Sequence, residues 1–419
     1  MRAGTWSTTR TIAAAHTSWR RARQVADRVP TDDPDRTAMR IAPRTLLCGT
    51  AWRAGGSGAD TGFDELRDLC TAAGDQRSLA IGMTGQLMAH YVNARSREAA
   101  RLASENIALL GSIGDPTLTV GLSFAAMLAK QETGEMAETL RVAQRVIDLA
   151  DGDPTMGDLI IGSPLSAAIA LRGVARWCLG IAGWKDDFGQ AVAVARAVDP
   201  TTLAGVLWCT LVPAIPNGVL LADATALSDT ADTLARTEQS GNDFALDVAR
   251  TARGLTLVHR GGTQRNAGFD LLAQAREAAV QERFDKMVVP IIDIHLAHER
   301  TRPGDLDGAI GLSRAVVDEL FDSGGSVWIA PATTVLVESL LRRGSDADLK
   351  DAQAAIDRLA AVPTDPGFVL YEIWLLRLRA LLARARGDEA AYREFVDRYR
   401  AMARSLGFEG HIAWAEAMT

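Results

Sequence analysis

The side chains best suited to hold a metal ion lie close together in the chain and include Asp293, His295, His298 and Glu299. In a helix, residues three apart share a face, so the two histidines could reach one cation. The order of the residues differs from the zinc-protease motif, in which the histidines are four apart and a glutamate follows the first. We therefore predict no metal site, and we expect one histidine to pack in the core and the other to face solvent.

A phosphate-binding P-loop requires a lysine between a glycine and a serine or threonine, because its ammonium group reaches the β and γ phosphates. The chain contains four lysines, and none has these neighbours: Lys130, Lys185, Lys286 and Lys350. The glycine-rich stretch at residues 56–58 also departs from the dinucleotide-binding fingerprint, since Thr61 stands where the third glycine is required. The sequence predicts no nucleotide cofactor.

The sequence also lacks the signals of nucleophilic catalysis. It contains no Gly-x-Ser-x-Gly motif, which would present a serine at a strand-to-helix turn. The four cysteines are far apart, form no Cys-x-x-Cys pair and have apolar neighbours: Cys48, Cys70, Cys178 and Cys209. We expect buried, reduced thiols, and we predict that the chain is not an enzyme, with no catalytic residue and no cofactor.

Three tryptophans, Trp177, Trp184 and Trp208, lie on successive predicted segments. Aromatic side chains on neighbouring helices can line a concave binding groove, although aromatics at helical spacing more often fill a core. We expect these three side chains to pack in the core, and we keep a place in the groove as the alternative.

The elements that would position these residues are helices. Residues 96–113 and 135–150 carry apolar side chains at spacings of three and four, and each segment is followed by Gly-Asp-Pro, whose proline we expect to start the next helix. Pro116 and Pro154 are 38 residues apart, and Asp199-Pro200 follows 46 residues later. Looser copies of the pattern follow Gly304 and Gly387. A helix-turn-helix unit that recurs at this period is typical of tetratricopeptide-like arrays. We predict an all-α superhelix of about ten helix pairs over residues 59–419, preceded by a basic helical segment over residues 1–58.

The charge and hydropathy of the chain argue against nucleic-acid coating, secretion and membrane insertion. The 419-residue chain has a net charge of −7, which argues against a protein that coats nucleic acid. Residues 1–53 are locally basic, with ten arginines and four aspartates, and we expect a solvated helix face there. The first 30 residues have no apolar signal core, and Pro213 and Pro216 interrupt the uncharged run 200–222. We expect a cytoplasmic protein without a membrane span.

The carboxy-terminal segment 392–411 resembles the tail of large actinobacterial signalling proteins, and residues 151–154, 171–180 and 214–221 fit the same family. These proteins combine a class III adenylate/guanylate cyclase domain, an AAA/STAND-type ATPase and a tetratricopeptide-like region. The resemblance covers essentially the whole chain, but only the family's helical region. Asn93 and Arg97 match the spacing of a cyclase catalytic pair without the surrounding sheet, so we interpret that match as chance.

The resemblance implies a non-catalytic helical-repeat module for protein or ligand recognition. We expect it to bind a protein partner or small ligand in a concave groove and to regulate a cyclase/ATPase signalling partner in cis or in trans, without contacting membrane or nucleic acid. Two alternatives remain open: a fragment of a class III cyclase/ATPase enzyme that lacks its catalytic domains, and the carboxy-terminal part of an ATPase-type transcriptional regulator.

Overall fold

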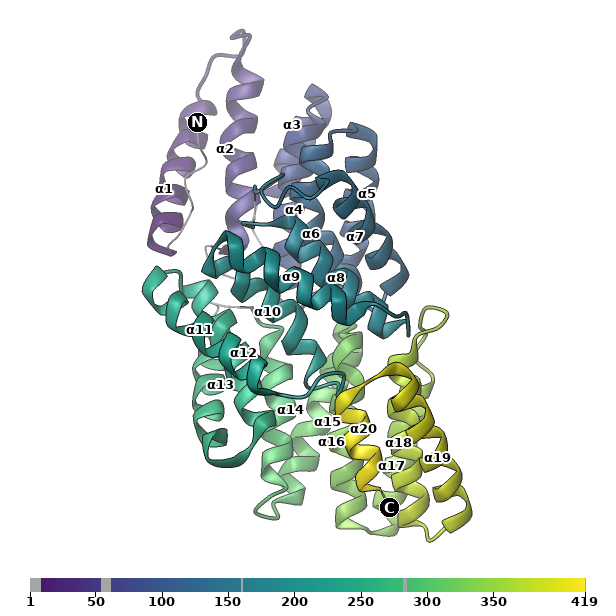
Figure 1. The fold of residues 1–419 in the computed structure, drawn as a ribbon. Coiled ribbons are helices and arrows are strands. Elements are labelled where there is room, and N and C mark those ends of the chain that lie inside the picture. Colours follow the sequence, from purple (N-terminus) through teal and green to yellow (C-terminus); the bar gives the residue numbers. More distant parts are fainter. Residues whose placement is uncertain (1–8, 54–61, 160, 282–284, 419) are drawn as a thin grey trace.

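The computed structural model describes residues 9–53, 62–159, 161–281 and 285–418, and within these ranges it contains 20 α-helices, two short 3₁₀-helices and no strand (Figure 1). The first ten α-helices are α1 (Thr9–Ala26), α2 (Arg36–Thr50), α3 (Phe63–Ala73), α4 (Gln76–Val92), α5 (Ser96–Ile113), α6 (Pro116–Glu132), α7 (Met136–Ala150), α8 (Pro164–Cys178), α9 (Trp184–Val198) and α10 (Pro200–Ala214). The others are α11 (Ala224–Ser240), α12 (Asp243–Arg260), α13 (Arg265–Val280), α14 (Val288–Arg300), α15 (Leu306–Ser323), α16 (Ser326–Arg343), α17 (Asp346–Ala360), α18 (Val369–Ala385), α19 (Glu389–Leu406) and α20 (Glu409–Ala417). The 3₁₀-helices span Ala51–Arg53 and Gly262–Gln264. The predicted all-α helical-repeat superhelix is confirmed.

Proline and its preceding cap residue set several helix starts. Pro116, Pro164 and Pro200 each occupy the first turn, where a missing N–H costs no hydrogen bond. The side chain before each proline accepts a hydrogen bond from a first-turn amide. The sequence pattern at Pro154 suggested a start there as well, but the next helix begins only at Pro164. Asp153 instead accepts hydrogen bonds from the amide and hydroxyl of Thr155, which stabilises a turn.

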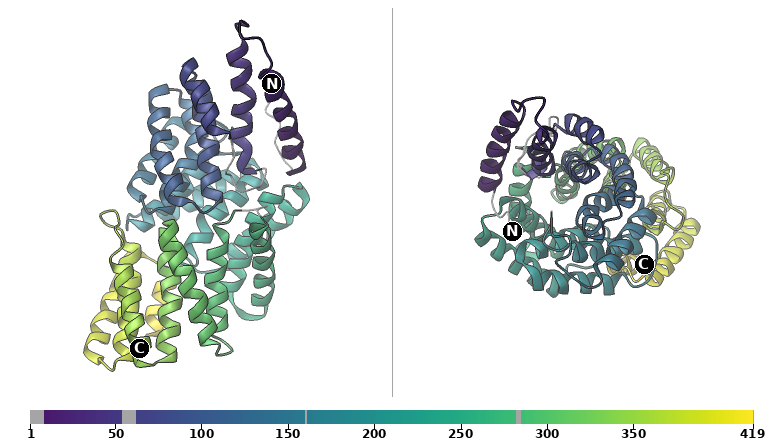
Figure 2. Two further views of the ribbon diagram at one scale, coloured as in Figure 1. Left: turned by 180° about the vertical axis from the view of Figure 1, so that it is seen from behind. Right: turned by 90° about the horizontal axis from the view of Figure 1, so that it is seen from above.

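From α4 onward the helices form two layers. The even-numbered helices form the inner layer: α4 contacts α6, and contacts continue through α8, α10 and α12, and again from α14 through α16 to α18. The odd-numbered helices pack outside them. An inner helix is covered on several sides, so most of α6 is buried. Helix α10 is also an inner helix and is largely buried, which explains why it consists of an uncharged stretch of the sequence. Seen along the axis, the helices wind around a common centre (Figure 2). No described helix combines the length and the apolar character needed to cross a bilayer.

Close packing of α2 on α4 depends on a glycine. A Cβ atom at Gly85 would lie 2.1 Å from the carbonyl oxygen of Cys48. This contact is shorter than any real one, so only glycine allows the two helices to approach so closely. The predicted boundary at residue 58 falls within residues 54–61, outside the described part, and the division into two segments stays a prediction.

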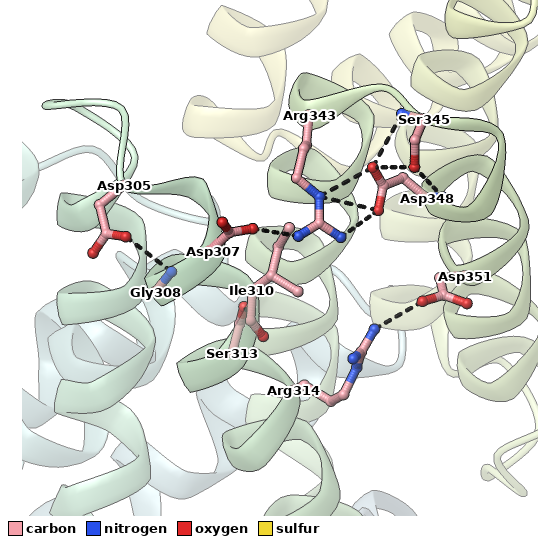
Figure 3. Close-up of polar contacts among 10 residues, drawn as sticks. All are labelled: Asp305, Asp307, Gly308, Ile310, Ser313, Arg314, Arg343, Ser345, Asp348 and Asp351. Carbon is pink, nitrogen blue, oxygen red and sulfur yellow. Dashed lines mark hydrogen bonds and ion pairs between the residues drawn. The ribbon is translucent and has the colours of Figure 1, made fainter.

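At the end of inner helix α16, Arg343 joins this helix to the outer helices α15 and α17 (Figure 3). Its guanidinium donates hydrogen bonds to Asp348, and its Nη1 lies 2.5 Å from Asp307 Oδ1. Asp348 and Ser345 also form a capping box at the start of α17. The hydrogen bonds from Arg343 and Ser345 hold the pKa of the Asp348 carboxyl well below its usual range.

Successive turns of the superhelix are in contact. Figure 1 shows α2–α9 above α13–α20. Residues that are 191 to 228 positions apart in the sequence are in contact where these two groups of helices meet. The contacts are Ser96 Oγ to Met287 Sδ (3.8 Å), Lys286 N to Val92 O (2.8 Å), Arg97 Nη2 to Phe321 O (2.9 Å), Ala137 N to Asp365 Oδ2 (2.8 Å) and Lys185 Nζ to Glu409 Oε1 (2.7 Å). The array is therefore a closed coil rather than an open solenoid.

Two buried acids lie near this contact. Glu132 is 4% exposed and Asp285 is 3% exposed, and Glu132 Oε1 has no hydrogen-bond partner among the described residues. Burial raises the pKa of Glu132 to about 8, and the negative charge of Asp285 adds to the effect. Burial likewise raises the pKa of Asp285 to about 7, against a hydrogen bond from the Met287 amide. Both carboxyls bind a proton more tightly in the folded chain than in the unfolded one.

A third buried acid, Asp187, is held by two arginines. Its Oδ1 accepts hydrogen bonds from Arg172 Nε (3.1 Å) and Nη2 (2.6 Å), and its Oδ2 accepts one from Arg176 Nη1 at 2.8 Å. The carboxylate joins α9 to α8, and Arg172 also bonds Gln144 of α7. Removal of such a carboxylate leaves buried positive charge without a partner.

Asp187→Ala is expected to lower the free energy of unfolding by about 2–4 kcal/mol, because both arginines lose their acceptor. The matched control is Asp186→Ala, which alters an exposed neighbour in the same helical turn and should change stability by no more than about 0.5 kcal/mol. Urea unfolding followed by circular dichroism measures both values. Equal losses in the two variants would contradict a structural role for the ion cluster.

Glu132→Gln is expected to change how stability depends on pH. The folded pKa of Glu132 lies above its unfolded value, so the stability this group supplies is complete below about pH 4 and is lost as pH rises to about 8. The amide that replaces the carboxyl in the variant stays neutral at every pH. We expect the variant to exceed the native chain in unfolding free energy by at least about 1 kcal/mol at pH 8, with the difference shrinking toward pH 5.

The control for this measurement is Glu98→Gln, since Glu98 is exposed. Urea unfolding at several pH values between 5 and 8 gives the comparison. A difference between Glu132→Gln and the native chain that stays constant over this range would show that Glu132 does not titrate with a raised pKa.

Candidate functional site

A cavity of about 290 Å³ lies on the inner face of the carboxy-terminal half. Residues of five inner helices line it: α12, α14, α16, α18 and α20. Arg265, the first residue of α13, and Pro216, in the turn after α10, complete the wall. The cavity thus draws its lining from segments spread over about half of the chain.

Helical spacing explains which side chains face the cavity. On α16 the lining residues are Pro331, Thr334, Val335 and Glu338, which recur at intervals of three and four and so share one face. Trp374 of α18 lines the same cavity. Aliphatic, proline and tryptophan side chains make up much of the wall.

Trp374 is held in place by a buried amide. Asn217 is completely buried, and its Oδ1 lies 3.4 Å from Trp374 Nε1. Pro331 lacks the N–H that would bond the carbonyl of Val327 four residues earlier, and Asn217 Nδ2 lies 3.3 Å from that oxygen instead. Asn217 therefore replaces the hydrogen bond lost at Pro331 and orients the indole.

The last helix closes the cavity. Trp414 of α20 lies 5.4 Å from Trp374, measured between ring centroids. The first amides of α20 are satisfied by the turn after α10, since Glu409 N donates to Val219 O and His411 N donates to Gly218 O. This turn tolerates no larger residue at 218, because a Cβ atom there would lie 2.5 Å from the Trp414 ring and φ is +66°.

Two histidines of the wall form a hydrogen-bonded pair. His295 Nδ1 lies 2.7 Å from Ile291 O, and a carbonyl oxygen can only accept, so Nδ1 carries the proton. In the neutral ring Nε2 is then an acceptor. His259 Nε2, 2.9 Å away, donates to it. Loss of hydration lowers the pKa of His295 to about 4 and holds the pKa of His259 well below its usual range. Both rings are neutral at pH 7.

His298 faces the cavity on the next turn of α14. It is exposed, whereas His295 is 7% exposed, which confirms the expected division between core and solvent. Loss of hydration lowers the pKa of His298, and the charges of Arg265 and Arg377 lower it further against Glu338 and Glu299. Among the described residues no group of three or more His, Cys, Asp and Glu side chains is placed to hold a metal ion.

Two arginines supply the positive charge of the cavity, and they differ in their partners. Arg265 uses its Nε and Nη2 on Glu299 Oε2 and its Nη1 on Val258 O. Arg377 donates from Nη2 to Glu338 Oε1 at 2.5 Å. Its Nε and Nη1 are buried and have no hydrogen-bond partner in the described part of the chain. Arg377 therefore differs from Arg265 in having two nitrogens that make no hydrogen bond within the described residues.

The structure places the three candidate groove tryptophans away from this cavity. Trp177 is completely buried and Trp184 is 5% exposed, and both pack edge-to-face on Phe408 with centroids 6.2 Å apart. Trp208 is part-exposed on inner helix α10, near Tyr91. Trp177 and Trp184 thus come together, Trp208 lies apart from them, and the groove role stays a prediction.

The cysteines resist ionisation. All four are buried and free. Burial raises the pKa of Cys209 to about 12 and that of Cys178 well above its usual range, and burial with the charge of Asp75 raises that of Cys70 to about 11. Thiols in this state are poor nucleophiles.

Sequence reasoning did not find Asn217, Trp374 or Arg377 as site residues. Two local signals were present: a proline inside α16, which demands a replacement donor, and a tryptophan and an arginine three residues apart on α18. Neither signal reveals that α12, α14 and α20 meet at the same place.

No family model matches the chain, and no curated protein matches it. Among solved structures, the chain is similar to a Rap protein complexed with competence and sporulation factor, at 11% sequence identity and a TM-score of 0.43. The alignment covers 95% of this chain and 99% of that one. A likeness of this size carries no functional argument.

Proposed function

We propose that this chain is a non-catalytic helical-repeat module that binds a protein segment or a small ligand in the inner cavity. The observation that carries the proposal is the cavity itself, where two tryptophans and an arginine with unused donors converge from separate inner helices. Binding sites of this kind are concave, mostly apolar and fitted with a few polar groups. Helical-repeat superhelices present their inner surface for recognition.

The finer part of the proposal is that the module regulates a class III cyclase or an ATPase signalling partner, in cis or in trans, in the cytoplasm. The resemblance of residues 392–411 to the tails of such proteins supports it. The paired neutral histidines and the buried thiols support a binding role rather than catalysis, because neither set is prepared to move protons or attack a substrate.

We expect the full chain to form no cyclic nucleotide from ATP or GTP with Mg²⁺ or Mn²⁺, and to bind ATP no more tightly than about millimolar, since no P-loop lysine is present to hold the phosphates. Cyclic nucleotide is measured by chromatography, and ATP binding by isothermal titration calorimetry. Saturable ATP binding at micromolar concentration would contradict a non-catalytic module.

The cavity itself is tested by thermal unfolding with a compound set that holds equal numbers of anionic, neutral and cationic members. A ligand that fills the site at 100 times its Kd adds about 2.7 kcal/mol to the unfolding free energy, so we expect at least one compound to raise Tm by a few degrees. Thr334→Phe, which places a ring in the cavity, should abolish that shift.

The matched control is Thr225→Phe, because Thr225 is exposed on outer helix α11. Its Tm shift with the same compound should equal that of the native chain. A shift that persists in Thr334→Phe places the ligand elsewhere, and the absence of any stabilising compound contradicts a small-ligand site in the cavity.

A further inference from the structure

We infer that the cavity accepts a carboxylate attached to a small apolar body, with Arg377 as the anchoring cation and Trp374 and Trp414 as the walls. This inference rests on the proposed function and adds the chemical class of the ligand.

The unused donors of Arg377 point to an anion. A guanidinium carries five N–H donors, arranged so that a carboxylate can accept two parallel hydrogen bonds along one edge. Only Nη2 has a partner among the described residues, through the single contact with Glu338. Buried N–H groups without acceptors are costly. A ligand carboxylate that accepts from Nη1 and Nη2 supplies the missing acceptor for Nη1 and so removes part of this deficit.

The neighbouring aromatic rings explain why these donors are empty. The Arg377 guanidinium carbon lies 5.4 Å from the Trp414 ring centroid and 5.8 Å from that of Trp374. The indoles stabilise the positive charge but offer no lone pair. Trp414 is part-exposed, so its indole can turn to admit a carboxylate beside Nη1. Trp374, held through Asn217, stays in place as the fixed wall.

Arg265 is less suited to this role. Each of its three nitrogens already donates one hydrogen bond, to Glu299 or to the carbonyl of Val258. Its charge is already paired with Glu299, and that of Arg377 is paired with Glu338. The His259 and His295 rings are neutral and add no charge of either sign to the cavity.

The Glu338 carboxylate already occupies part of the position on Arg377 where a ligand carboxylate would bind. Glu338 presents a carboxylate to Nη2 from α16, and its side chain is 30% exposed, so it can turn toward solvent. An incoming carboxylate performs the same chemistry and competes with it. Loss of Glu338 should therefore strengthen ligand binding, whereas loss of Arg377 should weaken it.

The remaining wall sets the size and polarity of the ligand. Val258, Ile294 and Val335 contribute aliphatic surface, and Pro216 and Pro331 add to it. The volume of about 290 Å³ is at the lower limit of ligand pockets. It suits a single aromatic or branched aliphatic group, supplied either by a free small carboxylic acid or by the carboxy-terminal residue of a peptide.

The probes are 4-phenylbutyrate and its uncharged amide, and an acetylated tetrapeptide that ends in phenylalanine with a free or an amidated carboxy terminus. Calorimetry on the full chain should show at least about tenfold weaker binding for each amide than for its acid. Binding of the small acid alone assigns the site to free carboxylates, and tighter binding of the peptide acid assigns it to peptide termini. Equal binding of acid and amide overturns the inference.

Three variants identify the anchor. Arg377→Gln should weaken binding of the acid by about tenfold or more, and Glu338→Gln should tighten it by about threefold or more. The control is Arg379→Gln, two residues along α18 and outside the cavity lining, where affinity should stay within about twofold. Because a folding defect cannot tighten binding, the Glu338 variant keeps the test decisive if Arg377→Gln is unstable. Unchanged affinity in Glu338→Gln and Arg377→Gln overturns the inference.

Failure of this inference is distinct from failure of the proposed function. A neutral or cationic compound that stabilises the native chain but not Thr334→Phe keeps the cavity as a binding site and rejects only the carboxylate.

Discussion

Each helix pair in this array has an apolar face that it cannot cover alone, and the rest of the structure depends on that constraint. An inner helix is covered by its outer partner and by the inner helices before and after it. Because the coil is closed by contacts between its turns, the inner helices are also enclosed from above or below, and α6 and α16 are buried over most of their length. Polar groups inside such a coil need partners from within the protein, since water reaches them poorly.

Many buried hydroxyls bond the carbonyl four residues earlier in their own helix, as Thr84 and Ser339 do, whereas other buried groups draw on a neighbouring helix or on a distant turn. Asp187 is satisfied by two arginines of α8, and Asn217 serves a proline-containing helix more than 100 residues away. The groups left without partners are therefore informative. Glu132 responds by holding a proton, because burial penalises its charge. Arg377 cannot lose its charge at any physiological pH, so its empty donors remain available to an acceptor.

The sequence predicts local structure far better than it predicts the cavity. Helix starts at Pro116 and Pro200 and the all-helical repeat follow from local spacing, which depends only on neighbours along the chain. The helix start expected at Pro154 was wrong because Asp153 accepts a hydrogen bond from the Thr155 amide in a turn instead of capping a helix. The pattern of residue types does not show which of these two hydrogen bonds forms. The cavity joins α12 to α20 across a superhelix whose curvature no local motif encodes. Tryptophans often contact ligands, but Trp177 and Trp184 instead pack against Phe408 in the core.

Helix α20 lines the cavity and also contacts the preceding turn of the superhelix. Trp414 stands at the cavity, while Glu409 on the same helix bonds Lys185 of α9 and receives a hydrogen bond from the Leu221 amide. A nine-residue helix is short and moves as one unit, so a ligand that turns or displaces Trp414 acts on the segment that ties the carboxy-terminal end to the amino-terminal half. Because the same helix also receives its amide acceptors from residues 218 and 219, any shift of α20 changes hydrogen bonds on both sides of the turn after α10. The cavity wall and the contact between the two halves therefore share one structural element, α20.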